Sequence, residues 1–440
     1  MNKLRPLAFA LLLPLLAAAQ TKWTREDCEA YARTNALSII RQQLTRQNAA
    51  LARTGAWDAY MPRLAADIAQ SSPSGESSTT SSSGSLTGTL PYGFEYGGRV
   101  NSSSGDSDDS WSLEVSKRIW GAGSWEGSLA SFRNAALADE SAELLLRRYT
   151  RELIESVRLR YHEIIRSRQT HISNNLRLEQ ARRNLEVALA NQNPLDIANA
   201  RYEVPQAEAQ LLRSERLITD AFDRLKETLG LDIAFQLDTE DVLPENHPVL
   251  DVQADLAWVL AQSEDVLIQE LRIQQLRNDL ANLRESLGPT ISIAASVNDT
   301  FGNSSDGTDH RLTLRASWPL GSLGDRAKAA SKENDILDAQ LQLRQNQISL
   351  NRQVLDYARR LDETERQIDV ARQRLDIALL RVELYKDKWD NGEIDILEYV
   401  RAQNAVEDGR IELINQETVY FDQLAAYIRL TACDTRGINY

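Results

Sequence analysis

The sequence predicts an elongated protein built from two copies of one unit, in which long helices flank a short antiparallel sheet. Three observations lead to this fold class: helical periodicity over very long segments, period-two alternation in short ones, and the same order of elements in both halves. Of the 440 residues 42% are hydrophobic, but only 7 Phe, 8 Trp and 2 Met are present. Large apolar side chains are therefore scarce for a single compact core.

Helical periodicity extends over six segments that contain few helix breakers: residues 24–60, 125–191, 196–229, 251–287, 325–390 and 394–430. They are rich in Ala, Leu, Gln, Arg and Glu, which favour helices. At about 1.5 Å per residue, each of the two longest helices would extend on the order of 100 Å. A globular core cannot accommodate such a helix, so these segments are expected to form coiled coils or the wall of a long object.

Strand-like segments are short and alternate between apolar and polar residues, at 111–116, 290–298 and 311–318 and more weakly at 63–70. In a strand this period places alternate residues on opposite faces. Leu312 and Leu314 therefore lie on an apolar face, whereas Arg311, Arg315 and Glu114 belong to polar faces.

These segments predict two β-hairpins, one over about 62–120 and one over about 289–320. Within the first, the Ser- and Gly-rich segment 71–110 is expected to be a long surface loop, in which residues 86–100 could add strand.

The N-terminus has the pattern of a secretory signal peptide over residues 1–20. Lys3 and Arg5 precede an apolar run at 7–16, and three alanines follow it. A membrane anchor would need roughly 20 apolar residues, and this run is shorter. The chain is therefore expected to be exported.

Both halves carry the same elements in the same order, which predicts a tandem duplication. Pro62 introduces the first hairpin and Pro289 the second, and each hairpin leads through a turn with Gly123 or Gly324 into a long helix. The predicted organisation is a signal at 1–20, a first repeat at 21–230, a linker at 231–250, a second repeat at 251–431 and a tail at 432–440.

Composition argues against several function classes. The formal net charge of −14 disfavours nucleic acid as the main partner, because phosphate binding needs a dense Lys/Arg surface. The 2 Cys are too few for a disulfide scaffold or a structural zinc site. Phosphate-binding Gly-rich loops and the Gly-x-Ser-x-Gly motif are missing, and the 4 His are scattered. The sequence therefore predicts no enzyme, no cofactor and no metal.

Two hairpins supply only four strands, each long enough to cross a bilayer when tilted. Four strands cannot close a barrel, and open sheet edges are not tolerated in lipid, so other chains would have to complete it. Two copies give eight strands, whose interior side chains fill, and three give twelve, which enclose a lumen. Arg311, Arg315 and Glu114 would then line that lumen. A soluble sheet with one wet face is the alternative.

Short motifs in a specific order carry a family resemblance. They are the two Pro-started hairpins, their exits at Trp120-Gly121-Ala122-Gly123 and Trp318-Pro319-Leu320, and the breakers Asn193-Pro194-Leu195-Asp196-Ile197 and Asn391-Gly392-Glu393-Ile394-Asp395-Ile396. On these motifs the chain resembles the TolC-like outer-membrane efflux proteins across essentially the whole mature sequence. The resemblance implies a mixed α/β membrane protein, a homotrimer with a 12-strand β-barrel in the outer membrane and a 12-helix α-barrel in the periplasm. It implies a passive exit duct of an efflux or type I secretion system, working with a periplasmic adaptor and an inner-membrane pump.

The same resemblance places the periplasmic mouth at the two breaker turns. The residues that it assigns to the mouth and to adaptor contact are Asn193, Pro194, Asp196, Trp389, Asn391, Gly392, Asp395, Glu398 and Arg401. Glu398 matches a position where the family carries an acidic residue, whereas Arg401 stands where a second one can occur. A ring of Glu398 carboxylates would attract cations, although Glu398 could equally be an ordinary solvated charge.

The family fold would also bring Cys28 and Cys433 to the same level, which makes a disulfide between them a hypothesis, with two separate thiols as the alternative. Two rival functions stay open on sequence grounds. One is a periplasmic coiled-coil adaptor or structural protein without a pore, and the other is an exported enzyme with a helical insert.

Overall fold

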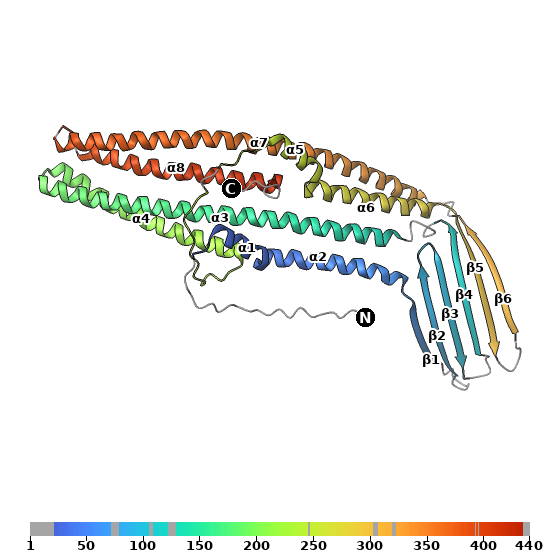
Figure 1. The fold of residues 1–440 in the computed structure, drawn as a ribbon. Helices are drawn as coiled ribbons and strands as arrows, with labels where there is room; N and C mark the ends of the chain where they lie inside the picture. The colour runs from blue at the N-terminus through green and yellow to red at the C-terminus, as the bar shows by residue number, and fades with distance from the viewer. Residues whose placement is uncertain are drawn as a thin grey trace.

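A computed structural model describes residues 22–71, 79–104, 109–121, 129–244, 247–301, 307–318, 323–391, 393–394 and 396–433. The molecule is elongated, with a layer of long helices and a sheet that extends from one end of it (Figure 1). The predicted signal at 1–20 lies outside the described residues.

The helices begin with α1 (Arg25–Asn35), α2 (Leu37–Gly55) and the short 3-10 helix η1 (Ala56–Tyr60), which divide the segment predicted as one helix. The others are α3 (Ala130–Asn191), α4 (Pro194–Leu229), α5 (Val252–Gln262), α6 (Glu264–Leu287), α7 (Leu323–Asp390) and α8 (Ile396–Thr431). Within the described part of the chain, no helix combines the length and apolarity needed to cross a bilayer.

Six strands form a single antiparallel sheet in chain order. They are β1 (Arg63–Ser71), β2 (Thr79–Leu90), β3 (Phe94–Ser103), β4 (Asp109–Trp120), β5 (Thr290–Phe301) and β6 (Gly307–Ser317).

The strands β2 and β3 correct the sequence-based prediction. The segment 71–110 is not mainly a surface loop, and the first repeat carries a four-stranded meander in place of a hairpin. The expectation of four strands per chain is wrong as well, since each chain supplies six. These strands were not predicted because their Ser- and Gly-rich composition is untypical of strands. They can form nevertheless, because the hydrogen bonds between strands use only backbone groups. Tyr92 and Gly93, with φ of 69° and 77°, form the turn between them.

The register gives this sheet one apolar face and one polar face. Leu64 lies opposite Leu86 and Leu113 opposite Val297, so the apolar row continues across the sheet. The apolar face includes Leu64, Ile68, Leu86, Leu90, Phe94, Val100, Trp111, Leu113, Val115, Ile291, Ile293, Val297, Leu312 and Leu314. The polar face carries Arg63, Asp67, Glu95, Arg99, Glu114, Arg118, Arg311 and Arg315.

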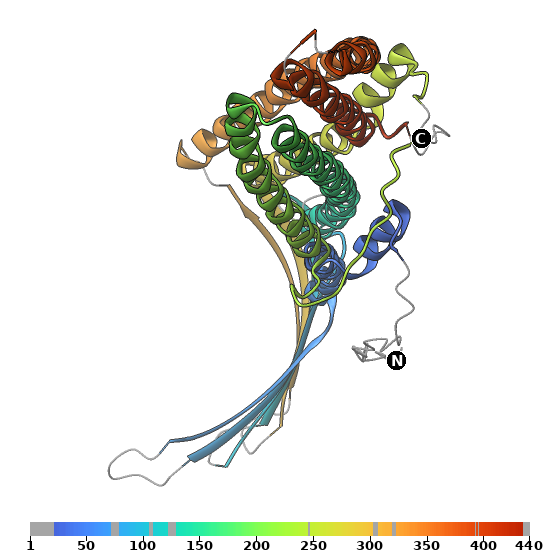
Figure 2. The same ribbon diagram turned by 90° about the vertical axis from the view of Figure 1, so that its left-hand side faces the viewer.

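The long helices lie side by side in a layer. Near the sheet the contacts follow the order α2–α3–α6–α7, and at the far end they follow α4–α3–α8–α7. The helices α3 and α7 run the length of the layer, whereas α2 with α4, and α6 with α8, succeed each other along it (Figures 1 and 2). The layer therefore has two outer sides, one formed by α2 and α4 and the other by α7.

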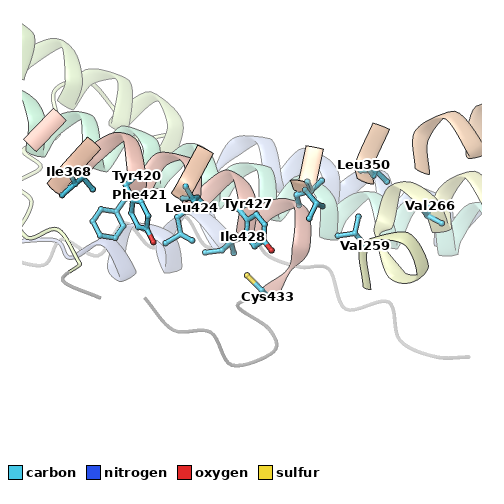
Figure 3. Packing of buried hydrophobic residues seen from close by; sticks show 13 residues of the cluster. Val259, Val266, Leu350, Ile368, Tyr420, Phe421, Leu424, Tyr427, Ile428 and Cys433 are labelled. Carbon is cyan, nitrogen blue, oxygen red and sulfur yellow. The ribbon is translucent and has the colours of Figure 1, made fainter. Parts of the chain in front are cut away.

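Two buried clusters hold the middle of the layer together. In the second repeat, Tyr420, Phe421, Leu424 and Tyr427 of α8 pack with residues of α5, α6 and α7 (Figure 3). In the first, Cys28 and Ala32 of α1 pack on α3 and on the end of α4, at residues that include Val157, Ile164 and Leu225. The two largest buried apolar clusters thus lie at mid-level, one in each repeat.

The inter-repeat segment is fixed to the outside of this middle region. The Arg168 guanidinium of α3 donates to the Thr239 carbonyl oxygen at 2.7 Å and to Asp241 at 2.5 Å, and it also pairs with Asp238. Trp23 forms an isolated bridge with Thr239. One arginine therefore anchors the crossing between the two repeats.

Gly121, at the end of β4, is expected not to tolerate a side chain. Its φ is 99°, and a Cβ there would lie 2.8 Å from the Pro289 carbonyl oxygen. Gly121→Ala should lower the yield of folded, heat-stable protein, with a cost of about 1–3 kcal/mol. Gly84→Ala in β2 is the matched control, because no atom lies within 4 Å of a Cβ at that position. Equal thermal stability of the two variants would contradict this assignment.

Candidate functional site

The two breaker turns meet at the end of the helical layer that lies far from the sheet (Figure 1). Ala188 of α3 and Ala200 of α4 pack against Ile396 and Val400 of α8, with Trp389 of α7 at the side of the cluster. A small apolar cluster thus holds all four helix ends at one tip.

The first turn owes its shape to local chemistry. Gln192 ends α3 with a left-handed φ of 59°. Asn193 then caps α4, because its side-chain oxygen accepts from the Leu195 N–H at 3.1 Å and its amide donates to Asp196 at 2.8 Å. Pro194 occupies the first helical position, where an N–H is not needed. The predicted residues Asn193, Pro194 and Asp196 therefore build the turn.

The second turn is fixed by aromatic stacking. The rings of Trp389 and Tyr399 lie parallel, with centroids 5.1 Å apart and an interplanar angle of 6°. Asn391 is exposed, and its N–H donates to the Asp387 carbonyl oxygen at 3.1 Å. Gly392 and Asp395 lie outside the described residues. Tyr399 was not singled out from the sequence, although an aromatic residue ten positions after Trp389 was visible there.

The charged residues at the start of α8 are exposed at the same tip. Glu398 lies in the first turn of α8, and Arg401 follows three residues later, on the neighbouring part of the same helix surface. A carboxylate near a helix N-terminus is favourably placed. The tip therefore presents acidic and basic side chains together, without a purely acidic face.

A polar seam joins the two repeats behind the tip, and sequence reasoning missed it. Arg177 of α3 pairs with Asp408 of α8, and the Asn184 amide donates to Gln403 at 3.3 Å. These residues border a cavity of about 230 Å³ between α3, α4 and α8. Burial raises the pKa of Glu203, which also lines the cavity.

Two polar pairs lie at mid-level, and no local sequence pattern indicated them. Arg158 of α3 donates to both carboxylate oxygens of Glu29 in α1, at 2.6 and 3.2 Å, and both residues are more than nine-tenths buried. His162, one turn further along α3, lies with Nδ1 2.8 Å from Asp422 of α8. The first pair ties α1 to α3, and the second ties the two repeats together.

Arg429, near the end of α8, pairs with Glu155 of α3 at 2.6 Å. Burial raises the pKa of Glu155, and the Arg429 charge opposes that rise. An arginine in the last turn of the helix is thus accounted for by a partner on the other repeat.

The register places the charged residues predicted for the sheet on its polar face. Glu114 lies opposite Ser296, and Ser296 lies opposite Arg311, so these three share one row. Arg315 lies opposite Ser292. On the same face, Arg118 pairs with Glu95 at 3.4 Å, a contact that involves one of the strands missed from the sequence. This face carries both signs of charge.

Cys28 and Cys433 are not joined by a disulfide in the described chain. Both are fully buried, but Cys28 belongs to the cluster of the first repeat and Cys433 to that of the second. Burial raises the pKa of the Cys28 thiol to about 12. The disulfide hypothesis is therefore not supported, and Cys28 is expected to be chemically inert. No cluster of His, Cys, Asp or Glu among the described residues could hold a metal.

The second repeat matches a known protein family. Residues 257–433 correspond to the family described as Outer membrane efflux protein. No curated protein matches the sequence.

The whole fold is similar to solved outer membrane channels. The open state of the Neisseria gonorrhoeae MtrE channel superposes with a TM-score of 0.73 at 13% identity, over 92% of this chain and 88% of that one. The Campylobacter jejuni CmeC channel gives 0.71 at 13% identity, over 92% and 85%. The Vibrio cholerae outer membrane protein VceC gives 0.68 at 16% identity, over 92% and 95%. At these identities the similarity establishes the fold.

Proposed function

We propose, from the premise that this chain is an outer membrane efflux protein with a TolC-like fold, that it acts as a homotrimeric exit duct. Its sheet would complete a barrel in the outer membrane, and its helices would continue as a tunnel into the periplasm. In this proposal the duct has no enzymatic activity and passes substrate from an inner-membrane pump that is coupled through a periplasmic adaptor.

The observation that carries the proposal is that the two free edges of the sheet continue into the two outer sides of the helical layer. Each side of the molecule is therefore a single edge along its whole length. Among the described strands, β1 and β6 each have a neighbour on one side only. The chain enters β1 from α2 and leaves β6 into α7, which are also the outer helices near the sheet. At the far end the outer helices are α4 and α7. Joining β6 of one copy to β1 of the next therefore also brings α7 against α2 and α4.

The outer helices expose apolar side chains at heptad spacing. On α2 these are Leu37, Leu44 and Leu51. On α7 the exposed apolar residues include Leu341 and Ile348, and further along Val370, Ile377 and Leu384. A spacing of seven residues keeps such side chains on one helix face and is the pattern of a coiled-coil seam. In water an exposed seam of this kind is unfavourable, so a second copy is the expected occupant.

The soluble-adaptor alternative is less compatible with the sheet. Leu64 and Ile68 of β1, and Leu312 and Leu314 of β6, are each at least 70% exposed on the apolar face. Helices do not cover this face (Figure 2). Exposed apolar side chains on every strand of this face fit lipid better than water.

The helix tip is the proposed periplasmic mouth and adaptor contact. Its described residues from the predicted set are Asn193, Pro194, Asp196, Trp389, Asn391, Glu398 and Arg401. The apolar cluster behind them lets the tip keep its shape while its exposed polar groups meet a partner.

Glu398→Gln is expected to reduce the cation preference of the pore. Three copies of Glu398 around a narrow mouth would concentrate cations, so neutralising them should lower the cation-to-anion permeability ratio by roughly twofold. Reversal potentials in a salt gradient measure this ratio. Glu26→Gln on α1, which is not a helix of the wall, is the matched control. An unchanged ratio in both variants would remove Glu398 from the mouth.

Planar-bilayer recording tests the proposed function. The purified mature protein should form ion-conducting channels, and chemical cross-linking should convert it to trimers. A protein that stays monomeric and soluble without detergent, and gives no conductance, would favour the adaptor alternative.

A further inference from the structure

The strands β2 and β3 widen the sheet from the four strands predicted by sequence to six. They are as long as their neighbours, with 12 and 10 residues, and the register is continuous from β1 to β4. Leu64, Leu86, Gly98 and Leu113 occupy successive positions of one row across these strands. The hairpin of β2 and β3 is therefore part of the sheet, and its apolar and polar faces continue those of β1 and β4.

A side-chain contact within the added hairpin supports its place in the sheet. Tyr96 of β3 lies directly opposite Gly88 of β2, and a Cβ on Gly88 would be 2.4 Å from the Tyr96 hydroxyl oxygen. The tyrosine ring thus covers the glycine, an arrangement that stabilises strand pairs at glycine positions. On the polar face β2 presents only short side chains, including Ser83, Ser85 and Thr87.

The width of six strands fits the width of the helical layer. Four helices at a spacing of 8–10 Å span roughly 30–40 Å. Six strands about 4.8 Å apart and tilted by about 40° span roughly 37 Å, whereas four span about 25 Å. On these spacings the six-stranded sheet matches the width of the helical layer more closely than four strands would.

We infer that this chain forms an eighteen-stranded barrel, wide enough that the barrel is not the size filter of the duct. The inference rests on the proposed trimer. Eighteen strands give a backbone diameter of about 36 Å, against about 24 Å for twelve. Barrels of this strand number enclose an aqueous channel.

A cysteine probe measures the barrel separately from the mouth. Thr313→Cys places a thiol on the polar face of β6, and Leu314→Cys places one on the apolar face as the matched control. Maleimide-linked polyethylene glycols of graded size are added to the outside of whole cells. The native Cys28 and Cys433 are fully buried, so the unsubstituted chain supplies the background. Thr313→Cys should react and Leu314→Cys should not.

The decisive comparison adds a deletion of residues 79–104. The deletion removes β2 and β3, so that β1 can pair directly with β4. The apolar residues of both strands would then still lie on the same face, because Leu64 and Leu113 belong to one row. The largest polymer that reaches Thr313→Cys should be about 1.5-fold greater in radius for the full chain than for the deletion variant. Equal limits in two trimeric, membrane-inserted proteins would overturn the inference and leave the proposed function intact. A full chain that is monomeric would overturn both.

Electron cryo-microscopy of the full chain keeps the inference testable if the deletion variant does not fold. Eighteen strands around the axis would support it, and twelve strands, with β2 and β3 outside the barrel, would overturn it.

Discussion

The double variant Leu341→Asp and Ile348→Asp is expected to leave the chain monomeric and without conductance. Both side chains lie on the outer face of α7 and are 59% and 65% exposed in the single chain. If α7 packs against α2 of the next copy, burial of each side chain contributes about 2 kcal/mol, and the change affects all three seams of a trimer. Six buried carboxylates without partners would add a further penalty. Cross-linking and bilayer recording measure the outcome.

Leu341→Met with Ile348→Leu is the matched control, because it preserves apolar volume at the same positions and should retain the trimer. Circular dichroism distinguishes a loss of assembly from a loss of folding. The aspartate variant and the apolar control should have similar helix content. A trimeric, conducting aspartate variant would show that this face of α7 is not the seam and would remove the main support for the proposed assembly.

Glu29→Ala is expected to destabilise the protein by about 3–5 kcal/mol, because it leaves the buried Arg158 guanidinium without its main partner. The pair is bidentate, with distances of 2.6 and 3.2 Å, and joins α1 to the middle of α3. Thermal unfolding followed by helical circular dichroism in detergent should show a clearly lowered midpoint.

Two variants define what that result means. Glu143→Ala removes exposed pairs with Arg147 at 2.8 Å and with Arg46 at 3.6 Å, and should change stability by less than about 1 kcal/mol. Replacing both Glu29 and Arg158 by leucine should recover much of the loss, since the buried Arg158 charge is then removed together with its partner. If Glu29→Ala were no worse than Glu143→Ala, the buried pair would not be a structural anchor.

The features that the sequence predicted well are those with a local, repeating cause. Long helices without proline, the period-two alternation of β5 and β6, and the Asn193-Pro194 turn each follow from a few neighbouring residues. The resemblance rested on such local motifs, and the family match and the fold confirm it.

Features that depend on residues distant in the chain could not be predicted in this way. The strands β2 and β3 are Ser- and Gly-rich, so their pairing depends on β1 and β4 as templates. Glu29 and Arg158 meet only because α1 folds back on α3, and the same is true of His162 and Asp422 across the two repeats.

By itself, the sequence predicted a duplicated, exported chain and determined its long helices and amphipathic strands, because helix and strand periods are visible in the spacing of apolar residues. The tertiary structure alone decided that the sheet has six strands, that the cysteines lie in separate cores, and which helices form the two outer sides of the wall. The physical reason is that pairing and burial depend on which surfaces meet, and a surface is assembled from residues that the sequence keeps far apart.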